Sequence, residues 1–202
     1  GLGDLSGVGY LAPGLEAAIA RAGRSVVYWY VSMLAADVPP QLSKPDAIAQ
    51  HCAASLDDLF RAVVRATQPA DLRFDVLMDR EPIDVWGRGR VTLLGDAAHQ
   101  MLPHAGQGAA QALEDAVALG LVLAPARDPA TSLRRYEMVR IVRTRRIVTL
   151  ARQIAGTTTT RNPIVTRLRT AALRHAPASA LLAALYPAGG ADPHRELRTT
   201  QP

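Results

Sequence analysis

The sequence has 202 residues, of which 49% are apolar, 20% are charged and 4% are aromatic. A chain of this length and apolar content can bury a real core, so general disorder is excluded. No stretch approaches about eighteen uninterrupted apolar residues, and no charged start leads into an apolar run. The sequence therefore predicts neither a transmembrane helix nor a signal peptide. Cys52 is the single cysteine, which excludes an intrachain disulfide and fits a reducing, cytoplasmic setting.

The net charge of +5 is unevenly distributed along the chain. Residues 1–126 hold 9 Lys and Arg against 14 Asp and Glu, whereas residues 127–202 hold 14 against 4. The basic character therefore belongs to the C-terminal third. Tyr136 and Tyr186 are the only aromatic residues there, too few to stack on bases, so we expect no nucleic-acid partner.

The first elements predicted by the sequence belong to a sheet. The glycine-rich residues 1–14 are typical of loops or strand ends, and residues 15–22 fit a helical turn or a strand equally well. Residues 24–34 are β-branched and aromatic and predict a strand. Because side chains alternate along a strand, Tyr28 and Tyr30 should share one face, opposite Val27, Trp29 and Val31.

The middle of the chain alternates between predicted helices and strands. Apolar residues at helical spacing predict one amphipathic helix over residues 46–67. Residues 71–78 are expected to form a strand. Residues 90–95 form a short apolar run that ends in glycine, as in a buried strand of a parallel sheet. A loop rich in Gly, His and Pro then leads to a helix over about residues 106–123.

The final third is predicted to be helical. An Asp-Pro pair and an Asn-Pro pair supply cap and first-turn signals for helices over residues 129–156 and 163–175. A short third helix is expected over residues 179–186, followed by a disordered tail over residues 187–202.

The segment with chemical content follows the predicted strand 90–95. Asp96 stands at its carboxyl end, where ligands bind in parallel α/β sheets, and a carboxylate there can accept hydrogen bonds from sugar or ribityl hydroxyls. Gly106 and Gly108 open the next helix. They remove Cβ atoms where free N–H groups and the positive end of the helix dipole would stabilise negative charge. On spacing alone, these glycines fit a turn before a core helix equally well.

The assembled string carries a resemblance to a known family. It runs Gly-Asp-Ala-Ala-His from Gly95, then Pro103, then Gly-Gln-Gly from Gly106, then Glu-Asp-Ala from Glu114. This string resembles the second flavin-binding motif of FAD-dependent monooxygenases with the p-hydroxybenzoate hydroxylase fold. It is most similar to the salicylate hydroxylase, urate hydroxylase and zeaxanthin epoxidase branches.

The resemblance implies roles for individual residues. Asp96, preceded by Gly95, would hydrogen-bond the ribityl chain of FAD. Pro103 would lie beside the isoalloxazine ring near the position where dioxygen reacts, and His104 would approach the flavin or the substrate, which makes both candidate catalytic residues. The pyrimidine edge of the ring would be held by backbone N–H groups around Gly106, Gln107 and Gly108. No metal site is expected, because neither cysteines nor suitably spaced acids accompany the histidines.

The resemblance also implies a fold class, which is mixed α/β. The chain would be the C-terminal half of an FAD-binding Rossmann-like domain with part of a substrate-binding sheet domain, followed by C-terminal helices. In the sheet domain, Tyr28 and Tyr30 are candidates for contacting the substrate. The expected divisions are the sheet domain at 1–78, the flavin motif at 79–126, the helices at 127–186 and the tail at 187–202.

The Gly-x-Gly-x-x-Gly fingerprint that binds the FAD pyrophosphate does not occur in the 202 residues. The resemblance therefore implies a fragment of an FAD-dependent monooxygenase, which would use dioxygen and NADPH or NADH to hydroxylate or epoxidise an aromatic or polycyclic molecule. We expect no stable FAD binding by this chain alone. Two alternatives stay open, namely a non-catalytic binding module from a truncated gene and a nucleic-acid-binding helical tail on an α/β domain.

Polar residues around the motif are expected to have structural roles. His99 should order the motif loop through hydrogen bonds. Glu114 and Asp115 should anchor the fold through charge-assisted hydrogen bonds. A spacing of three residues, typical of a solvated or ion-paired helix face, is shared by Arg140, Arg143 and Arg146.

Overall fold

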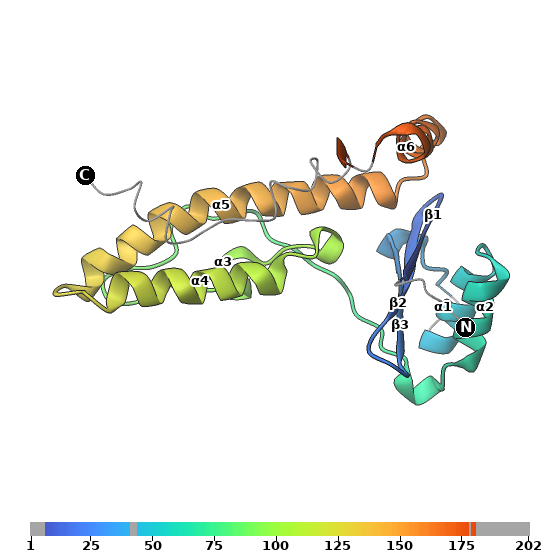
Figure 1. Cartoon of the computed structure of the whole chain (residues 1–202), viewed down its shortest axis with the longest axis horizontal. Helices are drawn as coiled ribbons and strands as arrows, with labels where there is room; N and C mark the ends of the chain where they lie inside the picture. Colours follow the sequence, from blue (N-terminus) through green and yellow to red (C-terminus); the bar gives the residue numbers. More distant parts are fainter. Residues whose placement is uncertain (1–6, 41–43, 178, 181–202) are drawn as a thin grey trace. The chain divides into compact units, whose positions relative to one another are not determined.

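The computed structural model describes residues 7–40, 44–177 and 179–180. The chain divides into two units. The first unit comprises residues 1–76 and 156–172, and the second comprises residues 77–155 and 173–202. Figure 1 shows a small sheet with its helices and a pair of long helices, so the predicted mixed α/β class is confirmed.

The first unit is built on a three-stranded antiparallel sheet in the order β1-β2-β3. Its strands are β1 (Gly7–Ala12), β2 (Leu15–Arg21) and β3 (Val27–Met33). Pro13 and Gly14 join β1 to β2, and Gly14 has a φ of 78°, which glycine adopts without steric cost. Residues 1–14 were expected to form loops or strand ends, and from Gly7 to Ala12 they form a whole strand. The undecided segment 15–22 is also a strand, β2.

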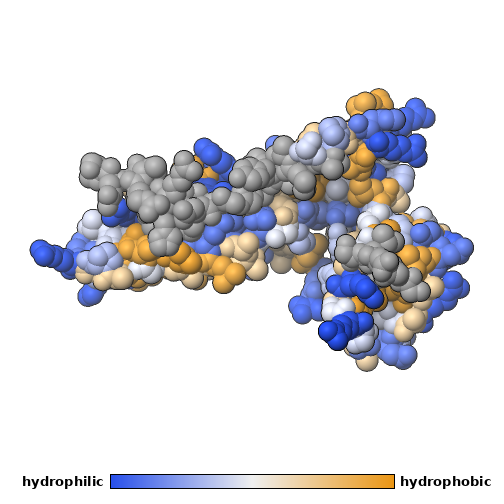
Figure 2. All heavy atoms as spheres, in the orientation of Figure 1, coloured by the Kyte–Doolittle hydropathy of each residue, from blue (hydrophilic) through white to orange (hydrophobic). Residues whose placement is uncertain are grey.

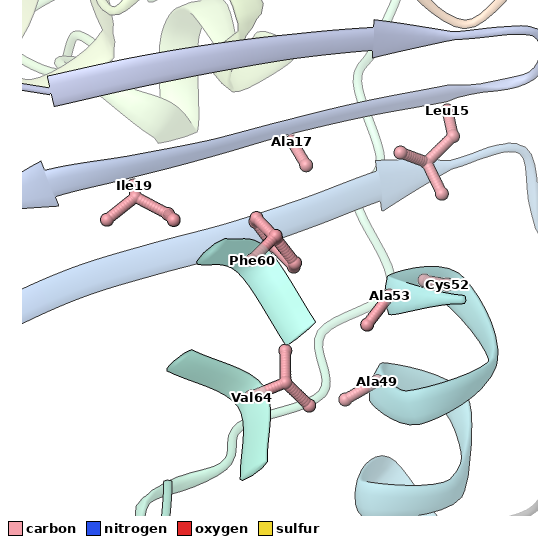
Figure 3. Packing of buried hydrophobic residues seen from close by; sticks show 8 residues of the cluster. All are labelled: Leu15, Ala17, Ile19, Ala49, Cys52, Ala53, Phe60 and Val64. Atoms are coloured by element: carbon pink, nitrogen blue, oxygen red, sulfur yellow. The ribbon is translucent and has the colours of Figure 1, made fainter. Parts of the chain in front are cut away.

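One face of this sheet carries the core of the first unit. Alternate residues of β2 point to it, and helices α1 (Pro45–Ala53) and α2 (Asp58–Ala66) pack against it (Figure 3). Trp29 and Val31 of β3 join the same cluster, so the predicted division of β3 into two faces is confirmed. The buried members of the cluster are Leu15, Ala17, Ile19, Ala49, Cys52, Ala53, Phe60 and Val64.

The single helix expected over residues 46–67 is two helices in the structure. Asp57 interrupts it: its backbone is extended, with φ −76° and ψ 176°, and its carboxylate accepts a hydrogen bond from the N–H of Phe60 at 2.9 Å. This is an N-cap, which ends one helical path and starts another. Helical spacing of apolar residues continued across the break, so it did not reveal the cap.

The second unit contains α3 (Asp96–His99), α4 (Gly108–Leu123) and most of α5 (Pro129–Thr158). In Figure 1, α4 and α5 lie side by side. Trp86 and Tyr136, whose rings are 5.8 Å apart, form a second apolar cluster with aliphatic residues of α3, α4 and α5. Within the described residues, short 3-10 turns lie at Ala35–Asp37, Pro69–Asp71 and Pro103–Ala105.

Two expected strands are not strands in the part of the chain that the structure describes. Residues 71–78 join no sheet. Residues 90–95 contribute only an isolated bridge between Arg88 and Val91 and a bond from the Leu93 N–H to the Trp86 carbonyl at 3.1 Å. A strand needs a neighbouring strand to complete its ladder, and the described residues place none beside either segment.

The C-terminal helices follow their local signals closely. The expected helices 129–156 and 163–175 are confirmed as α5 and α6 (Pro163–His175). Most of the expected helix 179–186 and the whole of the expected tail 187–202 lie outside the described residues. Among the described helices, none has the length and apolar character to cross a membrane.

Candidate functional site

The motif begins with a turn at Gly95. Gly95 has φ 58° and ψ −139°, a conformation that L side chains rarely adopt. Its carbonyl accepts the N–H groups of Ala98 and His99 at 2.8 and 2.9 Å, which closes the short helix α3. The sequence thus requires glycine here, and the turn places Asp96 at the first position of α3.

Asp96 has the accessibility that a ligand-binding carboxylate needs. Its side chain is exposed, and it accepts no hydrogen bond from any residue that the structure describes. The flanking chain is tied down instead, because Arg80 donates to the carbonyl oxygens of Ala97 and Ala98 at 2.6 and 3.3 Å. The segment is therefore held while the carboxylate of Asp96 stays available.

A second open feature lies at the start of α4. Gly106 has φ 63°, its N–H bonds to the Pro103 carbonyl at 2.7 Å, and a Cβ built on it would meet no atom within 4 Å. Gln107 is the N-cap of α4 and supplies no side-chain cap, so the first N–H groups of the helix have no intrahelical or capping acceptor. Gly108 is the first helical residue, and a Cβ there would make only an ordinary contact.

The two candidate catalytic residues stand in the 3-10 turn that precedes Gly106. Pro103 is exposed and His104 is half-buried. The proline ring therefore presents an apolar surface next to the uncapped end of α4. Both catalytic assignments stay predictions.

A buried polar cluster lies behind this surface, between α4 and α5. The Arg140 guanidinium is fully buried and lies 2.6 Å from Oδ1 of Asp115 and 2.7 Å from Oε2 of Glu114. Arg143 also pairs with Glu114, at 2.9 Å. The expected anchoring by charge-assisted hydrogen bonds is confirmed, and the ion-paired description holds for Arg140 and Arg143.

Burial and pairing act in opposite directions on these groups. Desolvation by itself would raise the pKa of Asp115, but hydrogen bonds from His99, the Gly95 N–H and Arg140 lower it overall. Desolvation likewise opposes ionisation of Glu114, whose pKa the bonds from Arg143 and Arg140 nevertheless lower. Both acids are therefore ionised at neutral pH.

Of the two descriptions expected for this helix face, the ion-paired one holds for Arg140, but its complete burial was not expected. Spacing on α5 could not show that this arginine faces α4. A usable signal was present, since two adjacent acids on one predicted helix and two arginines on the next form a complementary set. Arg146 is exposed, as expected of a solvated face.

Tyr28 and Tyr30 lie in the first unit, on the sheet face opposite the core. Their rings are 6.3 Å apart, and the Tyr30 hydroxyl donates to Oε1 of Glu16 at 2.8 Å. Burial, then the bond to Glu16, raises the pKa of Tyr30, so its hydroxyl stays a donor at neutral pH. Contact between these tyrosines and a substrate stays a prediction.

The residues of the motif fit a flavin on three structural grounds. Asp96 offers an unpartnered acceptor for ribityl hydroxyls, Gly106 leaves open the space a Cβ would fill, and the uncapped start of α4 presents donors to an electron-accepting ring. Among the described residues, no group of His, Cys, Asp and Glu could hold a metal ion.

Comparison with known proteins gives consistent matches. The chain is 49% identical over 77 residues to 3-hydroxybenzoate 6-hydroxylase 1 of Aquipseudomonas alcaligenes, covering 38% of this chain and 20% of that protein. It is 35% identical over 152 residues to the chloroplastic zeaxanthin epoxidase of Oryza sativa subsp. japonica, covering 70% and 23%. Klebsiella pneumoniae HpxO complexed with FAD and uric acid superposes with a TM-score of 0.79 at 27% identity, covering 88% and 46%.

The chain thus spans less than half the length of each of these proteins. The family described as FAD binding domain matches residues 13–151, which is more than half of the chain. The predicted resemblance to FAD-dependent monooxygenases is confirmed, and the chain belongs to the FAD binding domain family.

Proposed function

We propose that this chain supplies the ribityl- and ring-binding part of an FAD-dependent monooxygenase. The observation that carries the proposal is the pairing of an exposed, unpartnered Asp96 with the uncapped start of α4 behind Gly106. The names of its relatives support the reaction class, since they are a hydroxylase and an epoxidase.

In this function the residues of the chain bind and orient, and the bound flavin supplies the oxygen-transfer chemistry. Asp96 accepts hydrogen bonds from the ribityl chain. The N–H groups at Gly106, Gln107 and Gly108 hold the ring edge, where the positive end of the α4 dipole favours negative charge. Pro103 and His104 border the ring on the side of the substrate.

The overall reaction inserts one oxygen atom of dioxygen into the substrate and reduces the other to water, with two electrons from NADPH or NADH and one further proton. The substrate is an aromatic or polycyclic small molecule, which Tyr28 and Tyr30 contact through their rings. The small ring compounds in two relatives' names, hydroxybenzoate and uric acid, support this class. Residues 1–78 then serve the substrate, residues 79–126 the flavin, and residues 127–186 support the motif.

The test is a titration of the purified chain with riboflavin, FMN and FAD, followed by quenching of flavin fluorescence. We expect weak, reversible binding of similar strength for all three, because the motif contacts only the part they share. Asp96→Ala should weaken riboflavin binding roughly tenfold or more, as expected for a lost hydrogen bond to a charged group.

Asp84→Ala is the matched control, because Asp84 is an exposed acid of the same unit that pairs with Arg145 away from the motif. Its riboflavin affinity should equal that of the unmodified chain. Equal affinity in Asp96→Ala, or no binding of riboflavin at all, contradicts the proposal. Stoichiometric FAD retained through purification contradicts the expectation of weak binding.

A further inference from the structure

One carboxylate oxygen holds both ends of the turn that carries Asp96. Oδ2 of Asp115 accepts the Gly95 N–H at 2.9 Å and lies 2.7 Å from Nε2 of His99. Gly95 directly precedes α3 and His99 ends it. The side chain of Asp115 itself is fully buried on α4 and is not part of the exposed motif surface.

The hydrogen-bonding state of His99 follows from its surroundings. Its side chain is 2% exposed, and its Nδ1 atom has no hydrogen-bond partner among the residues described. A carboxylate can only accept, so the proton of the ring lies on Nε2 and points at Asp115. Both bonds to Oδ2 are therefore donated to it, one by a backbone amide and one by an imidazole.

The other oxygen of Asp115 is held from α5. Arg140 donates from Nε to Oδ1 at 2.6 Å, and its remaining donors reach Glu114 at 2.7 Å and the side chain and carbonyl of Gln111 at 2.8 and 3.1 Å. A guanidinium bound on three sides by α4 has little freedom. The position of Asp115 is therefore set by both helices, and Asp115 passes that position on to the turn.

We propose that Asp115 is a positioning residue for the flavin site: its Oδ2 orients the α3 turn, and with it Asp96, while Arg140 keeps Asp115 in place. This inference rests on the proposed function for the identity of the ligand. Asp115 touches no flavin in this arrangement. Its effect on binding passes through Gly95 and His99.

The first test is made without flavin, by NMR on the ¹⁵N-labelled chain. Asp115→Asn keeps the size of the side chain but replaces one acceptor oxygen with a donor, so it cannot serve Arg140 and the turn together. We expect the hydrogen-bonded signals of the Gly95 amide and the His99 Nε2–H to shift, and the Gly95 amide to exchange faster with solvent. An unchanged Gly95 amide in a folded variant overturns the proposal.

Glu137→Gln is the matched control. Glu137 is also a buried acid of the second unit, and it pairs with Arg134 and Thr92 instead of the α3 turn. It should alter stability in the same way as any buried acid without moving the Gly95 or His99 signals. A shift of equal size in this control also overturns the proposal, because it would show a general loosening.

The second test is riboflavin affinity at a temperature at which all variants are folded. Asp115→Asn should weaken binding about tenfold, the scale of one hydrogen bond to a charged group, and Glu137→Gln should not change it. If Asp115→Asn does not fold, His99→Leu is used instead. It removes the hydrogen bond from His99 to Asp115 and leaves the Asp115–Arg140 pair intact. It should weaken binding in the same direction.

The two proposals fail in different ways. If folded Asp115→Asn or His99→Leu binds riboflavin as tightly as the unmodified chain, the positioning role of Asp115 is overturned and the proposed flavin binding stands. Absence of riboflavin binding by the unmodified chain overturns the proposed function and the positioning of a flavin together. The NMR shifts then still decide whether Asp115 holds the turn.

Discussion

The interiors of the two units differ in the polar side chains that they bury beside their apolar clusters. The core of the first unit is apolar, with Phe60 and Ile19 fully buried against β2, α1 and α2. The most deeply buried large side chains of the second unit include Arg140, Gln111 and Asp115. Both units leave large apolar residues exposed, among them Ile164 at 67% in the first unit and Leu113 at 71% in the second. Figure 2 shows apolar side chains along α4 at the surface.

The difference teaches what each interior can specify. Apolar contact is not directional, so a core such as that of the first unit stabilises the fold and tolerates small shifts. Buried ion pairs offer little net stability, but they demand particular distances and angles. In this chain the ion pairs lie directly behind the candidate flavin site, where geometry matters more than stability.

The chain has a tryptophan in each unit, which allows the two interiors to be followed separately. Trp29 packs on the core of the first unit, and Trp86 is buried in the second. Replacing one of them by Phe leaves the other as the only indole fluorophore. The unfolding of each unit can therefore be followed by the fluorescence of its own indole.

The largest expected effect is that of Phe60→Ala on the first unit. Phe60 packs edge-on against Tyr10 and Trp29, so its removal leaves a cavity and should cost about 3–5 kcal/mol in the free energy of unfolding. Urea unfolding followed by Trp29 fluorescence measures it. Leu113→Ala in the second unit truncates an exposed residue and should change the free energy of unfolding by no more than about 0.5 kcal/mol. Equal losses of stability in Phe60→Ala and Leu113→Ala would contradict the assignment of Phe60 to the core.

The next largest effect is expected from acid, which should destabilise the second unit more than the first. The pKa of Asp115 and that of Glu114 are lowered in the fold, so their contribution is complete above the unfolded values of about 4 and is lost as pH falls below them. The second unit should therefore unfold at lower urea concentration at about pH 3 than at pH 6, as reported by Trp86. The groups that face these acids are the ring of His99, the hydroxyl of Tyr136 and the guanidinium groups of Arg140 and Arg143.

The first unit serves as the internal control for acid. Its one acid with a lowered pKa, among the described residues, is Asp58, which is exposed and pairs with Arg61 at the surface. Such pairs contribute little to stability. A larger acid-induced change in the Trp29 signal than in the Trp86 signal would reverse the proposed contrast.

The smallest predicted effect tests the break between α1 and α2. Asp57→Ala removes the cap on the Phe60 N–H and should destabilise the first unit by about 1 kcal/mol. Asp57→Asn keeps an acceptor and should restore most of that loss. Asp58→Ala, next to it and exposed, is the control, and a loss there as large as in Asp57→Ala would argue against capping.

Features with local causes could be predicted from the sequence. The N-terminal ends of α5 and α6 follow from the Asp-Pro and Asn-Pro caps, and the two faces of β3 follow from strand alternation. Gly95 was expected only as the last residue of a strand, and its positive φ is a conformation that glycine adopts because it has no side chain. The family resemblance came from the same segment.

Features that depend on distant partners could not be predicted. Segment 90–95 has the composition of a strand, but no described strand lies beside it. The strand β1 is rich in glycine and forms because β2 pairs with it. Arg140 is buried because α4 presents two acids to it, which spacing along α5 alone cannot reveal.

The hydrogen bonds from Gly95 and His99 to Asp115 also limit how the segment from Gly95 to Gly108 can be exchanged between proteins. A loop from Gly95 to Gly108 transplanted alone would leave behind the carboxylate that orders it. A transplant ending at residue 126 would carry Asp115 without Arg140 and bury an unpaired charge. The smallest portable piece therefore extends into α5 past Arg143, and any recombination point chosen between these helices should yield a protein that folds poorly.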